Sequence, residues 1–168
     1  MKRIHSFDPI VDRKSRILIL GTMPGPQALR KREYYGFRFN HFWKIIAGLF
    51  GGAGEWSYAE KVRLLKQNHI ALWDVLESCE RVGAADSKMR EMRPNDIPGL
   101  VARHPNIEAI FLNGGTAEKL FLKFFREVEE KLSITRLPST SPAHASMPFE
   151  AKLKAWSVIV HLSRFPQS

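Results

Sequence analysis

Short, mostly apolar runs along the chain alternate with longer segments in which apolar residues are spaced out. The short runs predict buried strands, because strands that are covered on both faces read as nearly continuous hydrophobic stretches. They lie at residues 17–20, 69–75, 107–112 and 134–137, and Pro138 ends the last of them.

Apolar residues that recur every three or four positions predict amphipathic helices between these strands. Asn40 is a residue type that caps helix N-termini and Gly51 is one that ends helices, so a helix is expected between them. Residues 81–93 carry Gly, Asp, Ser and Pro beside their basic side chains, which favours a basic loop. The predicted helices lie at residues 42–50, 58–67, 96–103, 115–132 and 149–160.

This alternation of strands and helices predicts the α/β class, with a parallel sheet covered by helices on both faces. The length of 168 residues and the 44% of hydrophobic residues fit one domain over residues 1–168. Ligands of such sheets bind beyond the carboxyl ends of the strands. The strand exits rich in small or polar residues should therefore converge at one edge: residues 21–25 (GTMPG), 113–116 (NGGT) and 138–142 (PSTSP).

The charge of the chain adds a class of partner to this picture. Lys and Arg number 26 against 17 Asp and Glu, a formal net charge of +9. Such an excess favours a polyanionic partner, because neutralising phosphates releases condensed counterions. A solvated basic surface explains the charge equally well, so charge alone leaves the choice open.

Several classes of protein are disfavoured by what the sequence lacks. No apolar run reaches the roughly 20 residues of a membrane span, and no apolar core follows the basic N-terminus as it does in a secretory signal. One cysteine, Cys79, excludes an internal disulfide framework and a four-cysteine metal site within the chain. We expect a cytoplasmic monomer without a membrane span, a metal or a cofactor.

The strand exits taken alone do not fix a chemistry. Residues 113–116 lead from a strand into a helix, where backbone amides can receive an anion, but Thr116 as a plain helix cap explains the same pattern. No Gly-Lys-Ser/Thr follows at the spacing of a phosphate-binding loop. Residues 21–25 also lack the dinucleotide-binding fingerprint.

Residues 34–43, YYGFRFNHFW, are the most informative segment of the chain. Phe42 and Trp43 fit the apolar face of the following helix and are expected in the core. Tyr35 and Arg38 lie outside that helical pattern. Aromatic side chains on a loop beside an arginine suit stacking on an extruded base, although a partly buried loop tyrosine is the alternative for Tyr35.

A series of motifs, in order and spacing, resembles the uracil-DNA glycosylase superfamily and, within it, the DNA-deoxyinosine (hypoxanthine-DNA) glycosylase branch. The resemblance covers most of the chain. It implies a three-layer α/β/α sandwich with a short, mainly parallel central sheet, and an enzyme that hydrolyses the N-glycosidic bond of a deaminated base in DNA. The motifs are LILGTMPG (18–25), YYGFRFNHFWKII (34–46), ALWDVLESCERVGAADSKM (71–89), AIFLNGGTAEKLF (109–121) and LPSTSPAHA (137–145).

The resemblance also shifts the expected catalytic residue. Superfamily members usually place a water-positioning Asp, Asn or Glu two residues after the first glycine of the turn, where this chain has Met23. A thioether cannot do that work. In the deoxyinosine branch the resemblance gives the role to Asn40, whose carbonyl can orient a water and whose amide can donate to a base carbonyl. Backbone amides of residues 22–25 would stabilise the departing base, and capping the helix competes for the Asn40 oxygen.

Further site residues follow from the same resemblance. Besides Met23, the chain departs from the family pattern in two places: Pro142-Ala143 stands where relatives carry a bulkier wedge, and Gly25 stands where the branch more often has serine. The residues implied for the base are Gly21, Thr22, Met23, Pro24, Gly25, Tyr35 and Asn113, and those implied for DNA are Arg38, Ser139, Ser141 and His144.

The leading hypothesis is a monofunctional DNA glycosylase that removes hypoxanthine first and uracil second, leaving an abasic site, with DNA containing deaminated bases as its partner. It is monofunctional because no lysine lies in the three strand exits to form a Schiff base. One alternative is a nucleic-acid-binding protein with this fold that has lost catalysis, which Met23 favours. Another is a small-molecule enzyme with a Rossmann-like sheet, which tight nucleotide binding without DNA affinity would favour.

Overall fold

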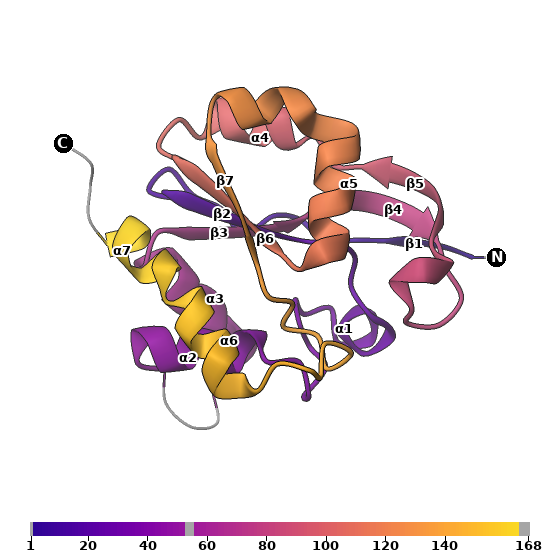
Figure 1. The fold of residues 1–168 in the computed structure, drawn as a ribbon, viewed down its shortest axis with the longest axis horizontal. Coiled ribbons are helices and arrows are strands. Elements are labelled where there is room, and N and C mark those ends of the chain that lie inside the picture. Colours follow the sequence, from indigo (N-terminus) through magenta and orange to yellow (C-terminus); the bar gives the residue numbers. More distant parts are fainter. Residues whose placement is uncertain (1, 53–55, 165–168) are drawn as a thin grey trace.

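The centre of the molecule is a parallel sheet, seen edge-on in Figure 1. The computed structural model describes residues 2–52 and 56–164. The sheet has four strands in the order β3-β2-β6-β7, and every neighbouring pair is parallel. The strands are β2 (Ile17–Gly21), β3 (Ile70–Asp74), β6 (Ala109–Asn113) and β7 (Ser133–Leu137). Every residue of β2, β3 and β6 is buried, which explains their continuous apolar runs.

Helices cover both faces of this sheet, so the expected three-layer α/β/α sandwich is confirmed. In Figure 1, α4 and α5 lie on one side of the sheet, and α2, α3, α6 and α7 lie on the other. Their bounds are α2 (Phe42–Phe50), α3 (Tyr58–Gln67), α4 (Ile97–Arg103), α5 (Gly115–Phe125), α6 (Phe149–Trp156) and α7 (Val158–Arg164).

Local signals in the sequence set several of these helix ends. Ser57 accepts a hydrogen bond from the Glu60 N–H at 3.2 Å, and Asp96 accepts one from the Gly99 N–H at 3.0 Å. Gly51 ends α2 with φ of 85°, a left-handed conformation that glycine adopts without strain. None of the helices in the described ranges is long and apolar enough to cross a membrane.

Two predicted helices are shorter than the apolar pattern indicated. The helix expected over residues 115–132 ends at Phe125, and a 3-10 turn, η2 (Arg126–Glu130), follows and still buries Val128. The helix expected over residues 149–160 is interrupted at Ser157. The Ser157 hydroxyl donates to the Lys154 carbonyl at 2.6 Å and so competes with the helical pattern.

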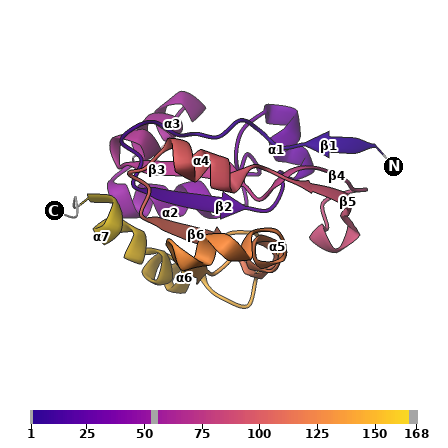
Figure 2. The same cartoon turned by 90° about the horizontal axis from the view of Figure 1, so that it is seen from above.

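A second, antiparallel sheet was not predicted. Its strand order is β1-β4-β5, and Figure 2 shows it at one end of the parallel sheet. It consists of β1 (Arg3–His5), β4 (Leu76–Glu80) and β5 (Arg90–Pro94), so part of the segment interpreted as a basic loop is a strand. β5 is an edge strand with mostly exposed charged residues, and such strands carry no apolar alternation.

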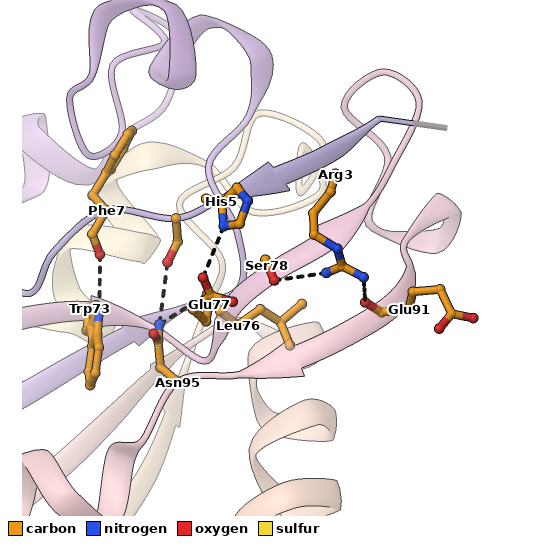
Figure 3. A network of polar contacts seen from close by, with 10 residues as sticks. Arg3, His5, Phe7, Trp73, Leu76, Glu77, Ser78, Glu91 and Asn95 are labelled. Atoms are coloured by element: carbon orange, nitrogen blue, oxygen red, sulfur yellow. Dashed lines mark hydrogen bonds and ion pairs between the residues drawn. The ribbon is translucent and has the colours of Figure 1, made fainter.

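Polar contacts hold this small sheet together (Figure 3). The Arg3 guanidinium donates to Ser78 Oγ and to the Glu91 carbonyl, each at 2.9 Å, and thereby connects all three strands. Two further short elements also lie in segments without a predicted structure, α1 (Pro26–Lys31) and the 3-10 turn η1 (Asp86–Lys88). The turn η1 and the loop that leads to it lie beside the carboxyl ends of the parallel strands and help to build the site.

Candidate active site

A cavity of about 480 Å³ lies at the carboxyl ends of the parallel strands. All three predicted strand exits contribute to it, as expected for a sheet of this class. The segment before α2 and the loop before β5 complete its wall. The lining includes residues 21–28, Tyr34, Tyr35, Phe37, Asn40, Asp74, residues 84–86, Asn113 and residues 139–143.

The first turn, residues 21–25, borders the cavity with backbone rather than with reactive side chains. Met23 is only 9% exposed and belongs to the hydrophobic core. The N–H groups of Met23 and Gly25 make no hydrogen bond with the described residues, so both are available as donors. Arg81 is buried, and it holds the turn by donating from Nη2 to the Pro24 carbonyl at 2.7 Å.

Position 21 requires glycine because two side chains closely approach its Cα atom. An ideal Cβ at this position would lie 2.6 Å from the Tyr35 hydroxyl and 2.7 Å from Asp74 Oδ1. The sheet register pairs Gly21 with Asp74, which explains why the Asp74 carboxyl lies beside the glycine. The Tyr35 hydroxyl reaches the same place from the loop before α2. Any larger residue would displace a cavity-lining side chain.

Asn40 lies in the cavity wall, just before α2. Its Oδ1 accepts a hydrogen bond from the Phe42 N–H at 2.9 Å, but the N-cap position of α2 belongs to His41 and not to Asn40. The sequence analysis expected Asn40 as the helix cap, and the observed N-cap is one residue later. An amide oxygen has two lone pairs, so Oδ1 retains one. The Asn40 Nδ2 group makes no hydrogen bond with the described residues.

Tyr35 is held in a strained position in the cavity wall. Its φ of 53° lies in the left-handed region, which costs of order 1–3 kcal/mol for such a residue. Its ring packs 4.2 Å from the Phe42 ring, measured between centroids, and its hydroxyl accepts from Asn113 Nδ2 at 3.0 Å. Burial and the nearby Asp74 carboxyl raise the pKa of this hydroxyl, whereas the Asn113 bond lowers it, and the net shift is upward.

Asn113 ties three segments together at the end of β6. Besides Tyr35, its Nδ2 donates to Thr140 Oγ1 at 3.0 Å, and its Oδ1 accepts from the Thr140 N–H at 3.0 Å. Both amide hydrogens are thus used within the protein. The adjacent Gly114 has φ of 96°, and a Cβ there would lie 2.8 Å from Ser139 Cβ.

The loop that follows β7, called the late loop below, borders the cavity through residues 139–143. Ser139 Oγ accepts a hydrogen bond from the Ser141 N–H at 3.1 Å, and Ser141 Oγ accepts one from the Ala143 N–H at 3.2 Å. The hydroxyl hydrogens of both serines remain free to donate. His144 and Arg38 do not line the cavity. Arg38 is exposed, and its guanidinium lies 4.4 Å from the centre of the Phe39 ring.

A buried lysine lies behind the late loop, in a helix rather than in a strand exit. The Lys152 ammonium donates to the Ser141 carbonyl at 3.4 Å, and burial lowers its pKa. Burial also lowers the pKa of His41, and the charges of Lys152 and Lys44 lower it further. Lys152 is not part of the cavity lining.

Asp74 is an acidic cavity residue that the sequence analysis missed. It is 4% exposed, and its Oδ2 has no hydrogen-bond partner within residues 2–52 and 56–164. Burial, and to a smaller extent the negative charge of Asp86, together raise the pKa of Asp74 to about 7. The signal was available: Asp74 is the one acidic residue of the run at residues 69–75, which was interpreted as strand throughout. The observed strand ends at Asp74, so the strand-exit rule applies to it as it does to the other exits.

Metal ligation finds no support in the described residues. No group of three or more His, Cys, Asp or Glu side chains there is placed to hold a metal ion. The lining instead combines amide, hydroxyl and carboxyl groups with aromatic and apolar surface.

Comparison with known proteins agrees with this fold. Residues 9–160 match the family model for the uracil DNA glycosylase superfamily. The chain is 37% identical to a hypoxanthine DNA glycosylase of Methanosarcina acetivorans over 114 residues, which cover 67% of this chain and 72% of the relative. It is 35% identical to a hypoxanthine DNA glycosylase of Methanosarcina barkeri over 111 residues, which cover 66% and 70%.

A solved structure extends this similarity to nearly the whole chain. The solution NMR structure of a candidate uracil DNA glycosylase from Methanosarcina acetivorans superimposes with a TM-score of 0.83 at 30% identity, covering 97% of this chain and 100% of that one. The chain therefore belongs to the uracil DNA glycosylase superfamily and is a DNA glycosylase.

Proposed function

We propose that this glycosylase removes deaminated bases from DNA, with hypoxanthine as its preferred base and uracil as a second one. The observation that carries the proposal is the cavity: it brings Asn40, the first turn and Tyr35 to one space at the carboxyl edge of the sheet. Both curated relatives described above are named for hypoxanthine, which favours that base.

The reaction is hydrolysis of the bond between C1′ of the deoxyribose and the base. As this bond breaks, its electron pair moves to the base, and the N–H groups of Met23 and Gly25 can stabilise the developing negative charge. The second lone pair of Asn40 Oδ1 can orient the water that adds to C1′, and Asn40 Nδ2 can donate to the base carbonyl.

The proposed function also requires the protein to bind DNA and to extrude the damaged base from the duplex. Extruding a base costs a few kcal/mol, and less at a weak pair, which favours deaminated bases over well-paired ones. Tyr35 and Phe37 offer aromatic surface within the cavity, and Ser139 and Ser141, which also line it, offer hydroxyl donors for phosphates. A cytoplasmic monomer acting without a metal is part of the proposal.

The test is an incubation panel of duplexes that carry hypoxanthine, uracil, xanthine or a thymine mismatch, followed by alkali cleavage. The expected order is cleavage at hypoxanthine first and at uracil more slowly. Salt-sensitive binding to every duplex with no alkali-labile site in any of them would instead show a binding protein that has lost catalysis. Equal release of undamaged bases would contradict the proposed selectivity.

A further inference from the structure

Asp74 is a buried acid without a counter-charge, placed in the wall of the cavity. Its side chain lines the cavity beside Gly21, and Oδ2 has no hydrogen-bond partner within the described ranges. Burying an unpaired charge is costly, so a carboxyl group in this position favours its neutral form. A neutral carboxyl group can donate a hydrogen bond. Met23 cannot donate one with its side chain, and both amide hydrogens of Asn113 are already used within the protein.

The backbone that carries Asp74 is fixed by the surrounding structure. The Asn95 side chain donates from Nδ2 to the Asp74 carbonyl at 2.8 Å. The same group donates to the Leu76 carbonyl at 3.1 Å (Figure 3). The Val75 N–H donates to the Gly21 carbonyl at 2.8 Å. Asp74 is thus anchored on both sides while its carboxyl group stays unpaired, which is how a protein presents a group to a ligand.

The charged and titratable groups around Asp74 bring its pKa close to neutrality, so roughly half of the carboxyl groups are protonated at pH 7 and most of them at lower pH. Burial and the Asp86 carboxylate both raise the pKa of Asp74, to about 7. Tyr34 and Tyr35 have pKa values raised above their ordinary range, so both hydroxyls are neutral. Burial raises the pKa of Asp86 and the Arg81 charge offsets part of that rise, and within the described residues Asp74 itself has no ion-pair partner.

We propose that Asp74 is a general acid of this glycosylase: in its protonated form it donates a hydrogen bond to the extruded base and passes that proton to the base as the glycosidic bond breaks. The inference rests on the proposed function and adds a second catalytic residue to it. The bond between C1′ and the base breaks, its electron pair goes to the base, and the Asp74 proton neutralises the base. Water adds to C1′ and releases a proton, which returns Asp74 to its acid form.

The ionised form of Asp74 works against the reaction. A carboxylate beside the base repels the negative charge that develops on the leaving group. A general acid acts only while protonated, so the rate is fully present below the pKa of Asp74 and is lost as the pH rises through it.

The test compares single-turnover rates of hypoxanthine release between pH 5.5 and 9 for the wild type and Asp74→Asn. The amide has the shape of the carboxyl group and can donate a hydrogen bond, but it cannot transfer a proton. We expect the wild-type rate to fall about tenfold per pH unit above a transition near pH 7. We expect the variant to be roughly 100-fold slower at pH 6 and to show no such transition. Binding of an abasic duplex and the melting temperature of the variant report whether its fold is intact.

A second variant tests the same acid without touching it. Asp86→Asn removes the charge that raises the pKa of Asp74, so the alkaline transition should move to lower pH. A wild type that releases base with the same pH profile as Asp74→Asn, or an unshifted transition in Asp86→Asn, overturns the assignment of Asp74. Failure of the wild type to release any base overturns the proposed function itself, so the two failures are distinguishable.

Discussion

Two parts of the cavity wall contribute different chemistry. The first turn, residues 21–25, presents backbone N–H groups and an apolar Met23, whereas the side chains of Asn40 and Asp74 present an amide and a carboxyl group. The strand register places Gly21 and Asp74 side by side. In the proposed mechanism, a turn without a reactive side chain still serves the site, because its backbone is held and side chains from other segments reach the same cavity.

The largest effect is expected from Asn40→Ala, which removes the side-chain oxygen and amide together. Base release should fall about 1,000-fold, because the group that orients the water and donates to the base is lost. Single-turnover cleavage of a hypoxanthine duplex measures it. The matched control is Asn106→Ala, an exposed asparagine outside the cavity, whose rate should stay at the wild-type level. An equal effect of both substitutions would remove Asn40 from the mechanism.

Gly21→Ala should disturb both parts of the wall at once. The added methyl would lie 2.6 Å from the Tyr35 hydroxyl and 2.7 Å from Asp74 Oδ1, so both side chains must move. Displacement of this size costs about 100-fold in rate and about 1–3 kcal/mol in stability. Single-turnover kinetics and thermal unfolding measure the two effects separately. Full activity in this variant would show that the contact between the turn and Asp74 has no role in catalysis.

Met23→Leu should have the smallest effect. The substitution conserves volume in a side chain that is 9% exposed, and it leaves the backbone N–H groups of the turn in place. We expect the rate to stay within about threefold of the wild type and stability to change by less than about 1.5 kcal/mol. A large loss of activity with an unchanged melting temperature would show that the thioether takes part in the reaction. The turn would then contribute a side chain as well as its backbone.

The sequence predicted the parts of the fold whose burial leaves a pattern. The run at residues 17–20 is buried on every side, and the helix at residues 58–67 has the predicted bounds. The convergence of three strand exits followed from the parallel sheet alone. β1 and β5 were missed because partly exposed edge strands with charged residues carry no hydrophobic periodicity.

The site was predicted in part, for a related reason. A resemblance in motifs predicted Asn40, Tyr35 and the turn as site residues, and all of them line the cavity. It could not show which polar groups already have partners. Only the structure shows that both amide hydrogens of Asn113 are used within the protein, and that Asp74 Oδ2 has no partner in the described residues. The pairing of polar groups depends on tertiary contacts between distant segments, and local pattern carries little of that information.

Direct identification of the products tests the central claim. A duplex with a single hypoxanthine is incubated with the wild-type protein, and the free base and the abasic sites are counted together. The account predicts free hypoxanthine and abasic sites in equal amounts, with the DNA strands unbroken until alkali is added. A duplex that is bound but still carries its hypoxanthine, with no free base released, would contradict it.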